Sequence, residues 1–229
     1  MTVKLKMLVF RVLDRLLENG NTTLVRYWGP DASIMRTIVC LRKHNMTQHK
    51  HEAYQLYVVA RSTRKVSGDI AEVGVYKGGT AKLMSYAQGN RGMHLFDTYE
   101  GMPPPTKEDA GAVQKWQQNI EATTVGTLDE VRALMTGVPG VRYYKGLFPE
   151  TSEPVKNKKF SLVHLDVDFY KATKGSLDFF YPRMNKGGVI ISHDYGQFAG
   201  VRQAFDEFFS DKPEPLIELS GSQVLVVKI

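Results

Sequence analysis

LVHLDVDFY, residues 162–170, is the segment from which the architecture of this chain can be predicted. Its apolar residues have the composition of a strand that is buried on both faces of a parallel sheet. Asp166 and Asp168 stand where that strand should run out, and their spacing places both side chains on one face of a continuing strand. In open α/β sheets the ligand crevice lies outside the carboxyl ends of the strands, so we expect both carboxylates at a functional site.

Two carboxylates this close repel each other unless a cation or a shared proton relieves the repulsion. A plainer interpretation stays open, in which the strand simply ends and an Asp caps the next helix. The two interpretations differ in whether other residues of the chain could share a cation or a proton with Asp166 and Asp168.

Alternating strands and helices surround this stretch. Strands are expected at 69–75, 93–97, 141–144, 160–167 and 188–192, and a closing hairpin at 215–219 and 224–227. Helices are expected at 32–42, 52–64, 81–87, 112–122, 128–135, 173–181 and 201–209. Such alternation predicts an α/β fold, a doubly wound and mostly parallel sheet of the Rossmann-like class, with an antiparallel hairpin strand at its C-terminal end.

The N-terminal part reads as a helical arm. Apolar residues recur at helical spacing over residues 5–17, with Gly20 in the position of a C-terminal cap. We therefore divide the chain into an arm or cap, residues 1–66, and an α/β domain, residues 67–229. The amphipathic helix over residues 5–17 could pack on its own domain, pair with a second copy in a homodimer or higher homo-oligomer, or rest on a membrane surface.

Composition narrows the function class. The chain has 42% hydrophobic and 24% charged residues, which is ordinary for a soluble globular protein of 229 residues. No apolar run approaches the roughly 20 residues that cross a bilayer, and Arg11, Asp14 and Arg15 interrupt any signal-peptide core. Cys40 is the only cysteine, so no internal disulfide can form. These features favour a cytoplasmic enzyme.

The net charge of +6 raises the question of nucleic-acid binding. The densest basic region, residues 36–65, has no zinc-finger, RNP or basic-zipper pattern beside it. We therefore interpret it as a solvated basic face and do not expect a nucleic-acid partner.

A glycine-rich turn follows the first strand expected in the α/β domain. Its sequence, EVGVYKGGT over residues 72–80, is neither a P-loop nor the dinucleotide pattern G-x-G-x-x-G. Glycine lets the backbone adopt positive φ and approach a ligand. Glu72, which lies just before the first glycine, would repel a pyrophosphate and suits a ligand that carries positive charge.

Asp97 ends the next strand, at the position where a dinucleotide enzyme places its ribose-binding acid. A carboxylate there can accept both hydroxyls of an adenosine ribose, although an Asp that caps the turn before Thr98 is the alternative. Acids on both sides of the glycine turn favour an adenosine cofactor with a cationic group, and S-adenosylmethionine fits that description.

His193 and Asp194 follow the strand expected at residues 188–192, which should lie beside Asp166 in a parallel sheet. Carboxylate oxygens together with an imidazole or water can complete a site for Mg²⁺ or a similar cation. A hydrogen-bonded histidine at a strand end is the alternative for His193. His164 lies inside its strand and is expected to be a satisfied core histidine.

Five motifs occur in the order of a known family: residues 72–80, 95–103, 146–151, 165–170 and 193–196. Together they resemble the macrocin O-methyltransferase family, whose members use S-adenosylmethionine and a metal to methylate sugar hydroxyls in antibiotic biosynthesis. The resemblance extends from about Gly68 to Phe209. It implies a class I methyltransferase that acts on a hydroxyl group of a small molecule.

The resemblance also implies roles for individual residues. It places Asp168 as the general base, and Asp166, His193 and Asp194 around a divalent cation. It places the remaining residues at the cofactor, with the methionine part near the glycine turn, the ribose near Asp97 and the adenine near residues 146–148. These cofactor residues are Glu72, Gly74, Tyr76, Gly79, Thr80, Asp97, Thr98, Gly146, Phe148 and Asp166.

One departure concerns the metal. The family usually has two acids before the tyrosine, whereas this chain has His193-Asp194-Tyr195. An imidazole binds Mg²⁺ poorly and favours Mn²⁺, Zn²⁺ or Fe²⁺. The cation expected from the resemblance is Mg²⁺, and the histidine makes its identity an open question. Two other function classes stay open, an NAD-dependent oxidoreductase and a non-catalytic binding protein that retains the fold.

Overall fold

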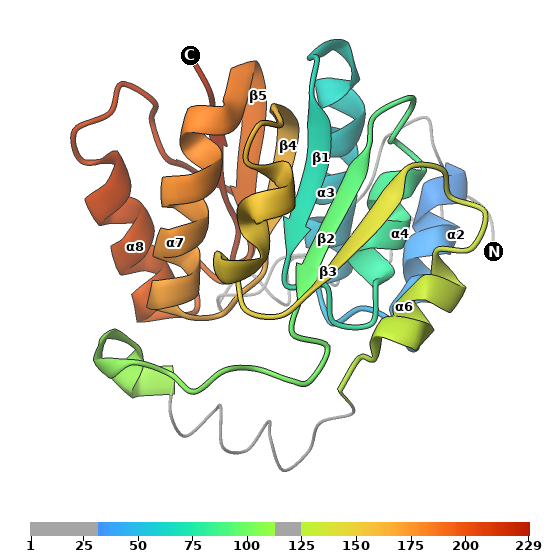
Figure 1. Cartoon of the computed structure of the whole chain (residues 1–229), viewed down its shortest axis with the longest axis horizontal. Coiled ribbons are helices and arrows are strands. Elements are labelled where there is room, and N and C mark those ends of the chain that lie inside the picture. The colour runs from blue at the N-terminus through green and yellow to red at the C-terminus, as the bar shows by residue number, and fades with distance from the viewer. Residues whose placement is uncertain (1–31, 113–124) are drawn as a thin grey trace, which may run out of the picture. The chain divides into compact units, whose positions relative to one another are not determined.

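A mostly parallel sheet organises the computed structural model, which describes residues 32–112 and 125–229. The strand order is β3-β2-β1-β4-β5-β7-β6 (Figure 1). The strands are β1 (Asp69–Val73), β2 (Met93–Asp97), β3 (Val141–Lys145), β4 (Phe160–Leu165), β5 (Met184–Ser192), β6 (Ile217–Glu218) and β7 (Val224–Val227). The strands β1 to β5 pair in parallel, and β7 joins β5 and β6 antiparallel. The predicted doubly wound sheet and its closing hairpin are therefore confirmed.

The helices lie on both faces of the sheet. They are α2 (Ala32–Leu41), α3 (Lys50–Ser62), α4 (Gly79–Ser85), α6 (Leu128–Leu134), α7 (Tyr170–Phe180) and α8 (Ala199–Phe209). Short 3₁₀ turns connect them at η1 (Thr63–Lys65), η2 (Lys107–Ala112), η3 (Glu150–Val155) and η4 (Tyr181–Arg183). In Figure 1, α7 and α8 stand on one side of the sheet, and α3 and α4 stand on the other.

Alternate residues of each central strand supply two hydrophobic cores. On β4, Leu162 faces the core that includes α2, α3 and α4, whereas Val163 and Leu165 face the core with α7 and α8. All six residues of β4 are buried, which confirms the prediction of a strand covered on both faces. By the same alternation, the side chains of Glu72, His164 and Asp166 lie on the face of the sheet that α3 covers.

The predicted elements mostly agree with the structure within a few residues. The largest differences concern two elements that begin earlier in the chain than predicted. The strand β5 begins at Met184 and not at the predicted residue 188, because Met184 already pairs with Phe160 of β4. Residues 185–188 form an irregularity in the pairing, which resumes with Val189 opposite Leu162. Helix α7 begins at Tyr170, ahead of the predicted residue 173.

Two predicted helices lie outside the described residues, the one over residues 5–17 and nearly all of the one over residues 112–122. Residues Ile34–Ile229 form one compact unit. The predicted division of the chain at residue 66 stays a prediction. Within the described ranges, no helix is both long enough and apolar enough to cross a membrane.

Candidate active site

The predicted acids gather at one edge of the sheet because parallel strands end together. Val73 at the end of β1 pairs with Phe96 and with Leu165, and Leu165 pairs with Ser192 at the end of β5. The residues that follow these strand ends are therefore neighbours in space, although they are far apart in the sequence. The site is built at the carboxyl edge of the central strands, as the sequence predicted.

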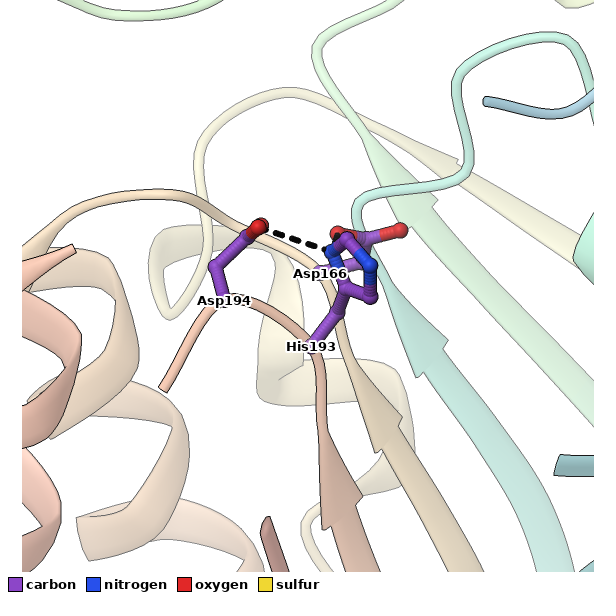
Figure 2. Close-up of side chains that lie close together, drawn as sticks. All are labelled: Asp166, His193 and Asp194. Carbon is purple, nitrogen blue, oxygen red and sulfur yellow. Dashed lines mark ion pairs between the residues drawn. The ribbon is translucent and has the colours of Figure 1, made fainter. Parts of the chain in front are cut away.

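Asp166, His193 and Asp194 form the closest cluster at this edge (Figure 2). The His193 Nδ1 atom lies 2.9 Å from Asp194 Oδ1 and 3.3 Å from Asp166 Oδ1. Each of the three residues offers one ligand atom, and these atoms all lie within 4.8 Å of one another. Two carboxylate oxygens and an imidazole nitrogen at this spacing can hold a divalent cation.

The charges in this cluster depend on one another. Burial alone would lower the pKa of His193, but Asp166, Asp194 and Glu52 raise that pKa far above its usual value. Burial raises the pKa of Asp194, and the charge of Asp166 adds to this rise. Burial also disfavours the charged form of Asp166, yet His193 lowers the net pKa of Asp166 below its usual value. A protonated imidazole therefore neutralises carboxylate charge where a metal ion could do the same.

Asp168 lies beside this cluster in a strained backbone conformation. Its φ is +61°, and that of Asp194 is +67°, a left-handed region that Asp tolerates better than most residues. Burial raises the pKa of the Asp168 carboxyl well above its usual value, and the charges of Asp194 and Asp166 raise it further. A carboxyl group with a raised pKa can accept a proton near neutral pH.

The glycine turn after β1 is held by close backbone contacts. A Cβ on Gly74, whose φ is +84°, would lie 1.8 Å from the Asp166 carbonyl oxygen, so only glycine lets β1 approach β4 here. Asp97 Oδ2 accepts hydrogen bonds from the backbone N–H groups of Val75 at 2.6 Å and Tyr76 at 2.9 Å. The turn is thus fastened both to β4 and to the end of β2.

Asp97 also accepts a hydrogen bond from the loop that follows β2. Its Oδ1 accepts the Tyr99 N–H at 2.7 Å, while the Thr98 hydroxyl donates to the Gly101 carbonyl at 2.6 Å. The turn-capping role that the sequence left open for Asp97 is therefore present. Oδ2 already accepts two N–H groups, and Oδ1 accepts the Tyr99 N–H and, at 3.4 Å, the Thr98 hydroxyl. A ribose contact by Asp97 or Thr98 stays a prediction, and a ribose hydroxyl would have to share or replace one of these donors.

The segment before α3 covers the start of α4. The Gly79 N–H donates to the Asn45 carbonyl at 3.1 Å, and a Cβ on Gly79 would lie 2.6 Å from the Cβ of Met46. Thr80 next to Gly79 is buried. The compactness of Gly79 therefore serves packing within the chain, and its contact with a cofactor stays a prediction.

A buried polar chain connects the glycine turn to the acidic cluster. Glu72 Oε1 lies 2.8 Å from His164 Nδ1, and the Gln48 amide nitrogen lies 3.3 Å from His164 Nε2 and 3.0 Å from Asp166 Oδ2. His164 is thus the satisfied core histidine that the sequence predicted. Glu72 is fully buried, which raises its pKa. Among the described residues, Glu72 Oε2 and Gln48 Oε1 are buried without a hydrogen-bond partner.

Gly146 and Phe148, the two residues predicted to contact the adenine, lie in different surroundings. The Gly146 N–H donates to the Asp97 carbonyl at 3.0 Å, so Gly146 lies beside the end of β2. The Phe148 ring stacks on Phe180 with 5.1 Å between ring centroids and meets Phe96 edge-on at 5.2 Å. The structure therefore places Phe148 with the core of α7, apart from the face that carries Glu72, and its role stays a prediction.

Two residues of this region were absent from the predicted site. Gln48 precedes α3, and Glu52 lies in its first turn with no exposed surface. Glu52 lies 3.4 Å from His193 Nε2. The sequence carries no motif around either residue. A Glu in the first turn of a helix is ordinary, and only the packing of α3 on the sheet shows that Glu52 is buried at the site.

The sequence of this chain is similar to a known family of enzymes. The family described as Macrocin-O-methyltransferase (TylF) matches residues 41–225. The chain is 29% identical over 172 residues to an 8-demethyl-8-(2,3-dimethoxy-alpha-L-rhamnosyl)-tetracenomycin-C 4'-O-methyltransferase of Streptomyces olivaceus, covering 69% of this chain and 65% of the relative. It is 27% identical to Mycinamicin III 3''-O-methyltransferase of Micromonospora griseorubida, covering 77% of this chain and 71% of the relative.

Solved structures show the same fold. The O-methyltransferase NovP superposes with a TM-score of 0.68 at 23% identity, covering 77% of this chain and 79% of that chain. The calicheamicin methyltransferase CalS11 superposes with a TM-score of 0.61 at 15% identity, covering 91% of this chain and 98% of that chain. At these identities the likeness concerns the arrangement of the sheet and its helices.

Proposed function

The chain belongs to the macrocin O-methyltransferase family, and from this premise we propose that it transfers the methyl group of S-adenosylmethionine to a hydroxyl group of a sugar or glycosylated natural product. The proposal follows the substrates named for the relatives above, a rhamnosyl tetracenomycin and a mycinamicin. The observation that carries it is the cluster of Asp166, His193 and Asp194 at the carboxyl edge of the sheet, with Asp168 near enough for the charges of Asp194 and Asp166 to raise its pKa beyond the effect of burial.

The residues of the glycine turn fit a cofactor with a cationic group. Glu72 Oε2 and Gln48 Oε1 are buried acceptors that find no donor in the described part of the chain, and a ligand ammonium group would supply donors. We assign the methionine part to Glu72, Gly74, Tyr76, Gly79 and Thr80, together with Asp166. The ribose is assigned to Asp97 and Thr98, and the adenine to Gly146 and Phe148. Bound S-adenosylmethionine supplies the methyl group as a sulfonium substituent.

Asp166, His193 and Asp194 fit a divalent cation, because their ligand atoms lie within 4.8 Å of one another. A cation held there lowers the pKa of a hydroxyl group that binds it and fixes the direction of that group. The mixed oxygen and nitrogen ligand set favours Mn²⁺, Fe²⁺ or Zn²⁺ over Mg²⁺, since imidazole is a softer ligand than carboxylate. Mg²⁺ remains the cation that the family implies.

Asp168 is the proposed general base. Its raised pKa suits it to take the proton of the acceptor hydroxyl, a step that typically contributes about 10²–10⁴-fold to the rate. Asp168 and Asp194 both have left-handed backbone, a strained conformation of the kind that clusters at functional sites. Alignment of the acceptor oxygen by these residues should account for much of the remaining acceleration.

The test is a methyl-transfer assay on a panel of acceptors. Purified protein is incubated with methyl-labelled S-adenosylmethionine, Mn²⁺ or Mg²⁺, and either deoxysugar glycosides, free sugars or catechols, and the labelled product is identified by mass spectrometry. The proposal expects label on a sugar hydroxyl group. Transfer to catechols alone would contradict the proposed substrate class, and no transfer to any acceptor despite cofactor binding would support a non-catalytic protein.

A further inference from the structure

We infer that Glu52 is a positioning residue that holds the His193 ring so that its Nδ1 atom faces Asp166 and Asp194. The inference rests on the proposed function, because it concerns the cation site of the proposed reaction. It explains how this chain can use a histidine at a position where its family usually has an acid.

The His193 ring lies between two sets of carboxylates. Its Nδ1 atom faces Asp194 at 2.9 Å and Asp166 at 3.3 Å, on the side where the ligand atoms converge. Its Nε2 atom faces the opposite way and lies 3.4 Å from Glu52 Oε2. An Nε2–H group donated to Glu52 leaves the Nδ1 lone pair for a cation. Histidine ligands of metals commonly have such a carboxylate behind them, which fixes the ring and the tautomer.

Glu52 is itself held rigidly. Its Oε1 accepts the N–H of Ser222 at 2.8 Å and the Ser222 hydroxyl at 2.9 Å. Its Oε2 accepts the His49 N–H at 2.9 Å. A Cβ on Gly221 would lie 2.5 Å from Glu52 Oε1, so the turn between β6 and β7 is closed down on this carboxylate. Glu52 thus joins α3, the C-terminal hairpin and the end of β5.

The simpler account of Glu52 is a helix cap, and the chain offers a direct comparison. Glu52 occupies the third position of α3, where a Glu accepts the N–H of the capping residue. Glu130 does the same in α6, accepting the Thr127 N–H at 2.8 Å. Glu130 is exposed, whereas Glu52 is fully buried and also contacts Ser222 and His193. Capping alone does not require this burial or these contacts.

The experiment measures Mn²⁺ binding to the full chain in the presence of S-adenosylhomocysteine, with free Mn²⁺ followed by electron paramagnetic resonance. Glu52→Gln is compared with the matched control Glu130→Gln. An amide has one acceptor oxygen, so in Glu52→Gln either Ser222 or the histidines lose their acceptor. We expect Glu52→Gln to weaken Mn²⁺ binding by about 10- to 100-fold. We expect Glu130→Gln to bind Mn²⁺ like the wild type.

A second readout separates positioning from stability. The visible absorption of bound Co²⁺ reports its ligand geometry, and it should change in Glu52→Gln and stay unchanged in Glu130→Gln. Equal Mn²⁺ affinities and equal Co²⁺ spectra in wild type and folded Glu52→Gln would overturn the inference and leave the proposed function intact. A wild type that binds no divalent cation would overturn the proposed cation site together with the inference.

Ser222→Ala is a second variant that tests the inference if Glu52→Gln does not fold. It removes one hydroxyl donor to the same carboxylate and keeps the charge of Glu52. It also removes the acceptor of the Asp194 N–H at 3.4 Å, so the decisive result is an unchanged Mn²⁺ affinity. The inference expects a measurable loss of Mn²⁺ affinity in Ser222→Ala, smaller than that of Glu52→Gln. Wild-type Mn²⁺ affinity in folded Ser222→Ala, with Glu52→Gln unfolded, would overturn it.

Discussion

Asp168 is the residue on which the proposed chemistry depends most. Replacing it by Asn keeps its size and polarity and removes its ability to accept a proton. We expect Asp168→Asn to lose about 10²–10⁴-fold in kcat, the usual contribution of a general base. Binding of S-adenosylhomocysteine, measured by isothermal titration calorimetry, should stay within about threefold of the wild type.

The control for Asp168→Asn is Asp178→Asn on α7, which removes an exposed carboxylate of an i,i+4 pair with Lys174. It should leave kcat unchanged, since exposed ion pairs contribute little even to stability. Near-normal turnover by Asp168→Asn would exclude Asp168 as the general base and would direct attention to Asp194.

Gly74 is the residue where the fold tolerates no side chain. Its φ is +84° and its Cβ position is filled by the backbone of Asp166. We expect Gly74→Ala to lower the free energy of unfolding by about 2–5 kcal/mol, because strain and overpacking add. Gly137→Ala, at φ +80° with nothing within 4 Å, should cost about 1–2 kcal/mol from strain alone. Urea denaturation of both variants measures the difference, and equal losses would contradict the close packing of β1 on β4.

At the scale of elements, the ends of strands were the most predictable features. Apolar runs followed by Asp97, Asp166 or His193-Asp194 marked the carboxyl ends of β2, β4 and β5, and pairing of these strands brought the residues together. The beginning of β5 was not predictable, because Asn185, Lys186 and Gly187 have the composition of a turn. The alternation of apolar and polar residues indicates which face of a strand is buried. It does not indicate the first residue of a strand that begins with polar residues.

The contribution of α3 to the site was also hidden from the sequence. Gln48 and Glu52 reach the site only because α3 packs against α4 and the sheet, a matter of tertiary placement. Local patterns cannot show that a Glu in the first turn of a helix is buried. The sequence therefore predicted the part of the site that sits on strand ends and missed the part that the arm contributes.

The C-terminal strand is fastened by a buried ion pair that makes stability depend on pH. Glu214 has no exposed side-chain surface; it contacts Lys228 and accepts the Tyr181 hydroxyl at 2.8 Å. Burial would raise the pKa of Glu214, but Lys228 and Tyr181 lower it to about 2. Because the pKa is lower in the folded protein, charged Glu214 contributes to the free energy of unfolding. This contribution is complete above the unfolded pKa of 4.5 and is lost as the pH falls toward about 2.

We therefore expect Glu214→Gln to lower the free energy of unfolding by on the order of 3 kcal/mol at pH 7. The gap between wild type and variant should narrow as the pH falls from about 4.5 toward about 2, because the Glu214 carboxyl group of the unfolded chain is protonated over this range while that of the folded protein stays charged. Urea denaturation at pH 7, 5 and 3 measures it. Glu218→Gln, which removes an exposed partner of Arg202, should cost little at any pH. A gap for Glu214→Gln that stays constant down to pH 3 would contradict the pKa assigned to Glu214.

At the scale of the whole molecule, one ligand should stabilise parts of the chain that are far apart in sequence. The polar groups around the site come from the segment before α3, from the ends of β1, β2, β4 and β5, and from the turn before β7. A ligand that binds only the folded chain raises its stability by mass action, by about 2.7 kcal/mol at a concentration of 100 times Kd. For a chain of this size that corresponds to a rise in Tm of about 5–10 °C.

We expect S-adenosylhomocysteine to produce such a rise in a thermal-unfolding scan and NAD to produce none, because Glu72 at the glycine turn repels a pyrophosphate. A chelator should abolish methyl transfer, and the rise in Tm with S-adenosylhomocysteine should persist, since the cofactor residues around Glu72 need no cation. If NAD raised Tm and S-adenosylhomocysteine did not, the chain would be an oxidoreductase of the same fold. Full methyl transfer after complete removal of metal would leave Asp166, His193 and Asp194 as a proton-linked cluster in which the imidazolium alone balances the carboxylates.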